Sequence, residues 1–278
     1  MKRFQMQYSD NRTFSEWLSA IEAFVDEHGL KGNVLLFEIF SDSHAIELVE
    51  PVISLIENRF PTAPYAGCST NGSIVEGKSA EEHVVVAANV FECPETKAEA
   101  IQLPISYDLQ QESGQTVVEA VKARPWVKAI EVLATIGNTD MPSLCKQISA
   151  VDDSIQVFGG GALAADVHDG NSAKTFVFSS AAKPAHNSAV FMLMGGEQLH
   201  VRSSFVTGWR NLGVPFEATD STRNVLKTLD DKPAFDVYNH YIGVAKDEHF
   251  FDISVVFPLC FETGGVPLLR VATNFGEA

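Results

Sequence analysis

The sequence predicts an α/β protein: mixed or largely parallel sheets flanked by helices with a pseudo-duplicated N-terminal part, followed by a more antiparallel α+β C-terminal part. Three observations carry this prediction. Short apolar runs, typical of strands covered on both faces, alternate with amphipathic helical patterns. The order of these elements recurs once before residue 180. From residue 189 onward, shorter strand patterns follow one another with turn residues between them.

The first unit begins with the clearest helical pattern in the chain. Apolar residues spaced three and four apart predict a helix from Thr13 to His28, with Thr13 and Glu16 as a capping box and Gly29 as its end. We expect this helix to bury Trp17, Ile21 and Phe24 against strands that contain Leu36 and Leu133. The elements predicted after it are a strand over 34–40, a helix over 45–60 that contains Pro51, a turn over 67–72 and a strand over 83–91.

A second unit repeats this order, although the two units share little sequence identity. Its predicted elements are a helix over 116–122, a strand over 130–136, a helix over 144–151, a strand over 155–158 that runs into a turn at 159–161, and a closing strand over 175–178. The repeated order favours a structural duplication.

The C-terminal part has a different pattern. Its predicted elements are a hairpin of strands over 189–194 and 198–205, a hairpin within 216–229, a helix from Pro233 to Tyr241 capped by Gly243, and strands over 250–258 and 266–273. We therefore expect one domain over residues 1–203 and a second domain over residues 204–278.

Charge and composition exclude several classes of partner. The 278 residues contain 20 Lys and Arg against 36 Asp and Glu, a formal net charge of −16, which repels nucleic acid and anionic membrane surfaces. No run approaches the ~20 apolar residues of a membrane span, and the N-terminus lacks the apolar core of a signal peptide. The four cysteines have no zinc-site spacing and read as free thiols. We expect a cytoplasmic protein.

A binding site is expected at the carboxyl ends of the predicted parallel strands, where α/β sheets bind ligands. If two such units pack face to face, their glycine-containing segments converge on one pocket. Trp209 could close one side as an aromatic lid, with Arg210 pairing a carboxylate, although a packed tryptophan is an equal alternative. The polar and glycine residues expected to line the pocket are Ser41, Ser69, Thr70, Asn71, Asn138, Gly160, Gly161 and Asp166.

Two motifs, one catalytic and one cofactor-binding, are incomplete in the sequence. A nucleophile elbow needs glycine two positions after Ser69, where Asn71 stands, and a dinucleotide motif starting at Gly159 fails at Ala164. We expect no enzyme, with a hydrolase-like activity as an alternative. His240 falls on the polar face of its predicted helix, so we expect no cofactor and no metal; haem b bound through His240 is the alternative.

Several stretches together resemble the FIST family of sensory domains. They are 35–41, the glycine-containing segment 67–74, 157–162 with Asp166, and later 208–213, 216–219, 224–226, 229–234, 238–243, 257–259 and 269–271. The resemblance covers nearly the whole chain, and it implies an N-terminal FIST domain followed by part of a C-terminal one, in a truncated or short member.

The resemblance also implies a function. It points to a bacterial signal-transduction sensor that binds a small polar metabolite, amino-acid-like or carboxylate, and regulates a histidine kinase or a cyclic-di-GMP enzyme, with a homodimer as a further expectation. A subset of the family resembles haem-based nitric oxide sensors, and this is the alternative reading.

Overall fold

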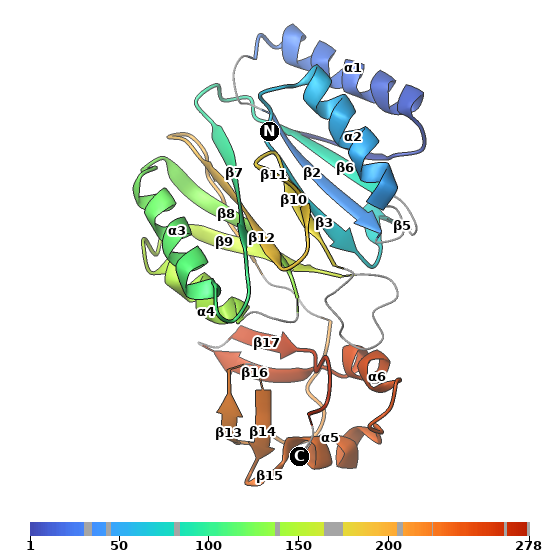
Figure 1. The fold of residues 1–278 in the computed structure, drawn as a ribbon, viewed down its shortest axis with the longest axis vertical. Helices are drawn as coiled ribbons and strands as arrows, with labels where there is room; N and C mark the ends of the chain where they lie inside the picture. Colours follow the sequence, from blue (N-terminus) through green and yellow to red (C-terminus); the bar gives the residue numbers. More distant parts are fainter. Residues whose placement is uncertain are drawn as a thin grey trace. The chain divides into compact units, whose positions relative to one another are not determined.

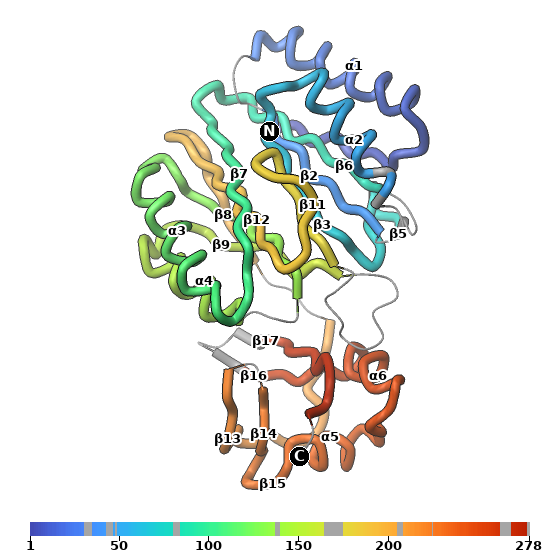
Figure 2. The backbone as a smooth tube through the Cα atoms, viewed as in Figure 1, coloured from blue at the N-terminus to red at the C-terminus, as the bar shows by residue number. Residues whose placement is uncertain are grey.

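The computed structural model describes residues 1–30, 35–42, 46–80, 84–136, 140–163, 175–204, 208–223, 225–263 and 266–276 (Figures 1 and 2). The chain divides into two compact units. The first contains residues 1–165 and 172–203, and the second contains residues 166–171 and 204–278. Each unit is described by itself.

The first unit contains a six-stranded sheet in the order β1-β6-β2-β3-β10-β11. Strands β2 and β3 are parallel, and the other neighbours are antiparallel. The elements that build this half are β1 (Lys2–Gln7), α1 (Asn11–Glu27), β2 (Leu35–Asp42), α2 (Ile46–Arg59), β3 (Tyr65–Thr70), the hairpin of β4 (Ser73–Val75) and β5 (Lys78–Ala80), β6 (Val84–Val90), β10 (Val177–Ser179) and β11 (Ala182–Ala185).

A four-stranded sheet completes the first unit, in the order β7-β12-β8-β9. Here β8 and β9 are parallel, and β12 is antiparallel to both of its neighbours. The elements are β7 (Lys97–Pro104), α3 (Gln110–Lys122), β8 (Val127–Thr135), α4 (Met141–Ser149), β9 (Gln156–Ala162) and β12 (Ser188–Gly195).

The predicted duplication is confirmed by the strand order. Both halves run strand, helix, strand, helix, strand, hairpin, strand, and the last strand inserts between the first two, giving β1-β6-β2-β3 and β7-β12-β8-β9. One assignment within it was wrong. The strand that closes the second half is β12; β10, at 177–179, instead crosses to the first sheet and pairs with β3.

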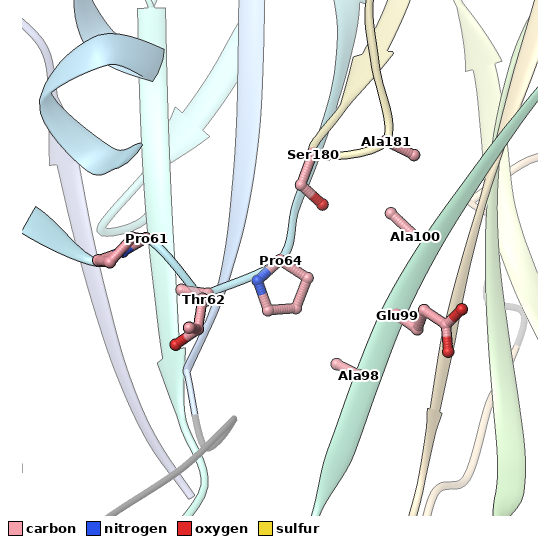
Figure 3. A pocket seen from close by; sticks show the side chains of 9 residues that line it. Pro61, Thr62, Pro64, Ala98, Glu99, Ala100, Ser180 and Ala181 are labelled. Atoms are coloured by element: carbon pink, nitrogen blue, oxygen red, sulfur yellow. The ribbon is translucent and has the colours of Figure 1, made fainter. Parts of the chain in front are cut away.

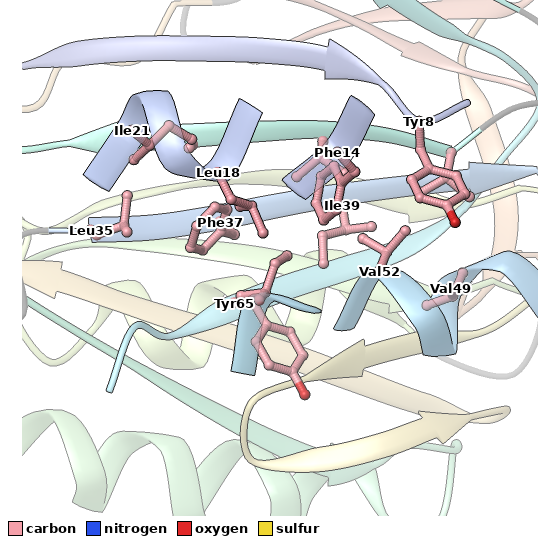
Figure 4. Close-up of a cluster of buried hydrophobic side chains, with 14 of the residues drawn as sticks. Tyr8, Phe14, Leu18, Ile21, Leu35, Phe37, Ile39, Val49, Val52 and Tyr65 are labelled. Carbon is pink, nitrogen blue, oxygen red and sulfur yellow. The ribbon is translucent and has the colours of Figure 1, made fainter. Parts of the chain in front are cut away.

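The first unit has four layers, with helices outside and two sheets inside (Figure 1). Helices α1 and α2 cover the six-stranded sheet, and their core includes Phe14, Leu18 and Phe37 (Figure 4). Helices α3 and α4 cover the other sheet in the same way. The inner faces of the two sheets share a third core, which contains Leu36 and Leu133.

Those inner leucines correct an expectation about α1. Its apolar face does pack on a sheet, with Ile21 buried and Trp17 and Phe24 partly buried. Leu36 and Leu133 lie on the opposite side of their strands, between the sheets. Because side chains alternate along a strand, the residues of β2 that face α1 are odd-numbered, such as Phe37.

The start of α1 also differs from the prediction. Asp10 is the N-cap, and its carboxylate accepts the Thr13 N–H at 2.9 Å and the Thr13 hydroxyl at 2.9 Å. Asp10 precedes Thr13 by three positions, which is the spacing between an N-cap side chain and the N3 backbone N–H that donates to it. Gly29 does end the helix, in the left-handed conformation that glycine adopts without strain.

The second unit contains a three-stranded sheet, a two-stranded sheet and two short helices. The hairpin and the Gly243-capped helix are confirmed. Residues 250–256 form a helix where a strand was predicted, and residues 198–204 form no strand. The elements are β13 (Ala218–Thr222), β14 (Val225–Leu229), β15 (Lys232–Pro233), α5 (Ala234–Ile242), α6 (Phe250–Val256), β16 (Leu259–Thr263) and β17 (Val266–Arg270).

The helices of the described residues are too short or too polar to cross a membrane.

Candidate functional site

The carboxyl ends of β3 and β9 meet at one corner of the first unit. The Leu163 N–H, just after β9, donates to the Ser69 carbonyl in β3 at 3.1 Å. Each of these strands is the parallel neighbour of a central strand, β2 or β8. The two glycine-containing segments singled out in the sequence therefore lie side by side, and we call this region the β3–β9 corner.

The glycines do not form the turns that the sequence suggested. Gly67 lies inside β3, and Gly159 to Gly161 lie inside β9. The chain turns only after β3, where the Thr70 hydroxyl donates to the Gly72 carbonyl at 2.6 Å and Gly72 has a φ of 113°. Glycine is needed inside these strands because an added Cβ at Gly67 or Gly159 would overlap neighbouring backbone.

Two of the predicted ligand residues are buried by the fold itself. Ser69 is 1% exposed, and its hydroxyl accepts the Phe176 N–H at 3.1 Å. Ser41 is fully buried, and its hydroxyl donates to the Asp42 carbonyl at 3.1 Å. Both hydroxyls hydrogen-bond with backbone groups in the interior, which is a structural task.

Other predicted residues at the corner do reach the surface. Asn71, Gly160 and Gly161 are exposed, and Thr70 is partly buried. An added Cβ at Gly160 would meet no atom within 4 Å, so open space adjoins this glycine. The corner thus presents one carboxamide and several main-chain groups, without a charged side chain among these four residues.

The remaining predicted site residues fall elsewhere. Trp209 and Arg210 belong to the second unit, where the Trp209 indole N–H donates to the Val256 carbonyl at 2.9 Å, although the side chain is 52% exposed. His240 is exposed on α5, edge-on to Tyr241. The two others, Asn138 and Asp166, lie outside the described residues.

A partly buried polar network on the inner side of the six-stranded sheet was missed by the sequence analysis. Arg3 of β1 contacts Glu38 of β2 at 2.7 Å and donates to the Asn89 side-chain oxygen at 3.0 Å. The Asn89 amide donates to the same Glu38 oxygen at 3.1 Å. A charged residue in the middle of the apolar strand 35–40 is the signal that could have revealed it.

Glu131 enters the same interior from the other sheet. It is 6% exposed, and its Oε2 atom has no hydrogen-bond partner among the described residues. Burial, and then the negative charge of Glu38, raise the pKa of Glu131 to about 8, while Arg3 opposes this shift. Glu131 therefore retains its proton near neutral pH.

The thiol nearest this interior is inert as a nucleophile. Burial, and then the charge of Glu131, raise the pKa of Cys68 to about 12. Because the thiolate is the reactive form, Cys68 is a buried structural residue. No group of three or more His, Cys, Asp and Glu side chains within the described ranges is arranged to hold a metal ion.

An open cavity of about 250 Å³ lies at the amino end of β3, away from the corner (Figure 3). Its one charged side chain is Glu99, which Arg124 holds in a two-point ion pair with contacts of 2.8 and 2.5 Å. That pairing lowers the pKa of Glu99 and leaves its charge compensated. The residues lining the cavity are Pro61, Thr62, Ala63, Pro64, Ala98, Glu99, Ala100, Ser180 and Ala181.

Comparison with known families gives one match. The family model of the FIST N domain matches residues 34–232, which contain most of both repeats and the β3–β9 corner. No curated protein matches the chain.

Proposed function

The chain belongs to the FIST family of signal-transduction sensor domains, and on this basis we propose that the β3–β9 corner binds a small polar metabolite, amino-acid-like or carboxylate. Occupancy of this site then regulates a partner, a histidine kinase or a cyclic-di-GMP enzyme. The observation that carries the proposal is the convergence of two parallel-strand ends, joined by the bond from Leu163 to Ser69, with exposed glycines beside an exposed asparagine.

The chemistry of the corner suits such a ligand. The Asn71 carboxamide offers both a donor and an acceptor, and Gly161, also exposed at this corner, directs its backbone groups away from β8. Glycine lets a ligand approach the backbone closely because no Cβ intervenes. A zwitterion or a carboxylate can be held by such groups without a metal or a cofactor.

Two features argue against catalysis by the potential nucleophiles Ser69 and Cys68. The Ser69 hydroxyl is buried and accepts a backbone N–H, and the buried Cys68 thiol keeps its proton. Neither supplies the activated nucleophile that a hydrolase requires. The sensory reading therefore has more support than the hydrolase-like alternative.

The proposal is tested by native mass spectrometry of the purified full chain, followed by titration with each small molecule found to be carried along. We expect one bound polar metabolite, and Asn71→Ala should weaken its binding about tenfold, the loss of one hydrogen bond of roughly 1.4 kcal/mol. Gln111→Ala removes a matched, exposed carboxamide from α3 and should leave binding unchanged. Equal affinity for the parent and Asn71→Ala would place the site elsewhere.

Haem is the competing ligand, and it has a separate signature. His240 is exposed on α5, which gives no enclosed pocket at that side chain. An intense Soret band in the purified protein, lost in His240→Ala, would replace the metabolite proposal with the haem alternative.

A further inference from the structure

The edges of the two sheets in the first unit differ in their protection. An unprotected edge strand exposes backbone groups that can pair with another chain, and proteins commonly guard such edges with charged residues or proline. Three of the four edge strands contain such residues: β1 contains Lys2 and Arg3, β11 contains Lys183 and Pro184, and β7 contains Lys97, Glu99 and Pro104. The fourth edge, β9, has neither a charged residue nor a proline.

The internal duplication shows what covers the equivalent edge in the first half. Glu38 of β2 corresponds to Glu131 of β8, and the next residue on each strand lies opposite a glycine, Gly67 in β3 or Gly159 in β9. The outer side of β3 pairs antiparallel with β10, which places Phe178 opposite Gly67. There, the Phe178 ring lies so close that an added Cβ on Gly67 would overlap it.

In the second half, no described strand lies along the edge that corresponds to this paired edge. Strand β9 pairs with β8 alone among the described strands. By the register shared with β3, the backbone groups of Val157, Gly159 and Gly161 point away from β8. The bond from Leu163, two residues further on, to Ser69 follows the same alternation.

The open stretch is short. Its far end is bounded by the contact of Leu163 with Ser69, and near its start the Ser203 hydroxyl donates to the Gln156 side chain at 3.0 Å. A slender extended chain fits the six residues between these two contacts more readily than the edge of a second sheet.

We propose that the edge of β9 next to the β3–β9 corner binds a short extended peptide, which pairs antiparallel with residues 157–161 of β9 and places an aromatic side chain over Gly159. This inference goes beyond the proposed function, because such a peptide is a second class of ligand beside the small polar metabolite. The peptide repeats on β9 what β10 does on β3: main-chain hydrogen bonds supply the pairing, and the ring covers a glycine that has no side chain.

The negative charge of the protein also favours a particular type of residue at the carboxyl end of the peptide. The protein carries a net charge of −16, and exposed Asp152 and Asp153 stand just before β9. The carboxyl end of an antiparallel peptide runs toward the start of β9 and therefore toward these aspartates. A lysine at that end should be favoured over a glutamate.

The test uses the full chain and the peptide acetyl-Phe-Val-Phe-Ser-Lys-amide, whose first four residues copy 176–179 of this protein. The β10 register places its second phenylalanine opposite Gly159 and its valine opposite Gly160. We expect saturable binding in a calorimetric titration. N-methylation of the second phenylalanine removes an N–H that points to β9 and should weaken binding at least tenfold.

The matched control is N-methylation of the valine, whose N–H points away from β9 and whose loss should leave the affinity within about twofold. Replacing the second phenylalanine by alanine should also weaken binding. Absence of binding, or equal affinity of the two methylated peptides, would overturn the inference.

The two proposals fail in distinguishable ways. A co-purified metabolite sensitive to Asn71→Ala, together with no peptide binding, would remove the peptide inference and leave the proposed function standing. Absence of both kinds of binding would remove both proposals.

Discussion

The two repeats of the first unit share a strand order and a register. They differ in how many of their backbone and side-chain polar groups are paired. In the first repeat, the outer edge of β3 is paired with β10, and Glu38 is held by Arg3 and Asn89. In the second, β9 has no strand on its outer side among the described residues, and one oxygen of Glu131 has no partner there. Among the described residues, the second repeat therefore leaves unpaired two kinds of group whose counterparts in the first repeat are paired.

The difference shows why a duplicated fold suits a sensor. Equivalent positions have the same backbone geometry, so an interaction present in one repeat indicates what the other could bind. The strand that crosses from the second half to cover β3 stabilises the first repeat and leaves β9 without such cover. Four measurements test this difference between the two repeats.

The interior glutamates should give the largest effect, as a dependence of stability on pH. Burial and the negative charge of Glu38 raise the pKa of Glu131 to about 8 in the fold, above the usual glutamate value of 4.5. The unfolded chain therefore loses this proton first, and the contribution of Glu131 to stability falls by up to about 1.4 kcal/mol per pH unit between those two values. In Glu131→Gln, urea unfolding from pH 5 to 8 should show a smaller fall than in the parent; an unchanged slope would contradict the assignment.

The paired and the open edge should respond differently to an added methyl group. Gly67→Ala should lower the free energy of unfolding by about 3 kcal/mol, because its Cβ would overlap the Phe178 ring and the Ile39 carbonyl. Gly160→Ala meets open space and should change it by less than about 0.5 kcal/mol. Chemical denaturation of the two variants measures this contrast, and equal losses would show that the space next to Gly160 is filled.

Two neighbouring residues at the corner should separate structure from binding. Ser69→Ala removes the buried acceptor of the Phe176 N–H and should cost about 2 kcal/mol of stability. Asn71→Ala removes an exposed side chain and should leave stability within about 0.5 kcal/mol. Thermal unfolding of both variants provides the comparison. A large loss in Asn71→Ala would mean that this side chain also supports the fold.

The smallest effect concerns the first helix of the first repeat. Asp10→Ala removes the acceptor of the Thr13 N–H and should lower the free energy of unfolding. The hydrogen bonds of Asp10 lower its pKa, so this contribution is fully present above the usual aspartate pKa of 3.8 and fades as the pH falls below it. Urea unfolding of the parent and the variant should therefore show a smaller difference at pH 3 than at pH 7.

Much of the fold could be predicted because the signals were local. The helical spacing of α1 and the apolar runs of β2 and β8 identified both repeats. Residues 250–256 were misassigned because phenylalanine, isoleucine and valine favour strands, whereas the packing of Phe250 against Phe235 and Tyr238 holds a helix there.

The site was less predictable because its key contacts join residues far apart in sequence. Ser69 looked available until its hydroxyl was found to accept the N–H of Phe176, 107 positions later. The open edge of β9 likewise depends on where β10 pairs, which no local pattern specifies. Of the predicted ligand residues that the structure describes in the first unit, Asn71, Gly160 and Gly161 are exposed.

The most direct test of the open edge is amide hydrogen exchange of the full chain without added ligand, measured by NMR on protein labelled with ¹⁵N-glycine. Gly67 pairs with β10 and Gly160 with β8, so both amides should exchange slowly. Gly159 and Gly161, whose amides point away from β8, should exchange close to the rate of an unstructured peptide. Protection of Gly159 and Gly161 equal to that of Gly67 would show that the edge is already paired and would contradict the account.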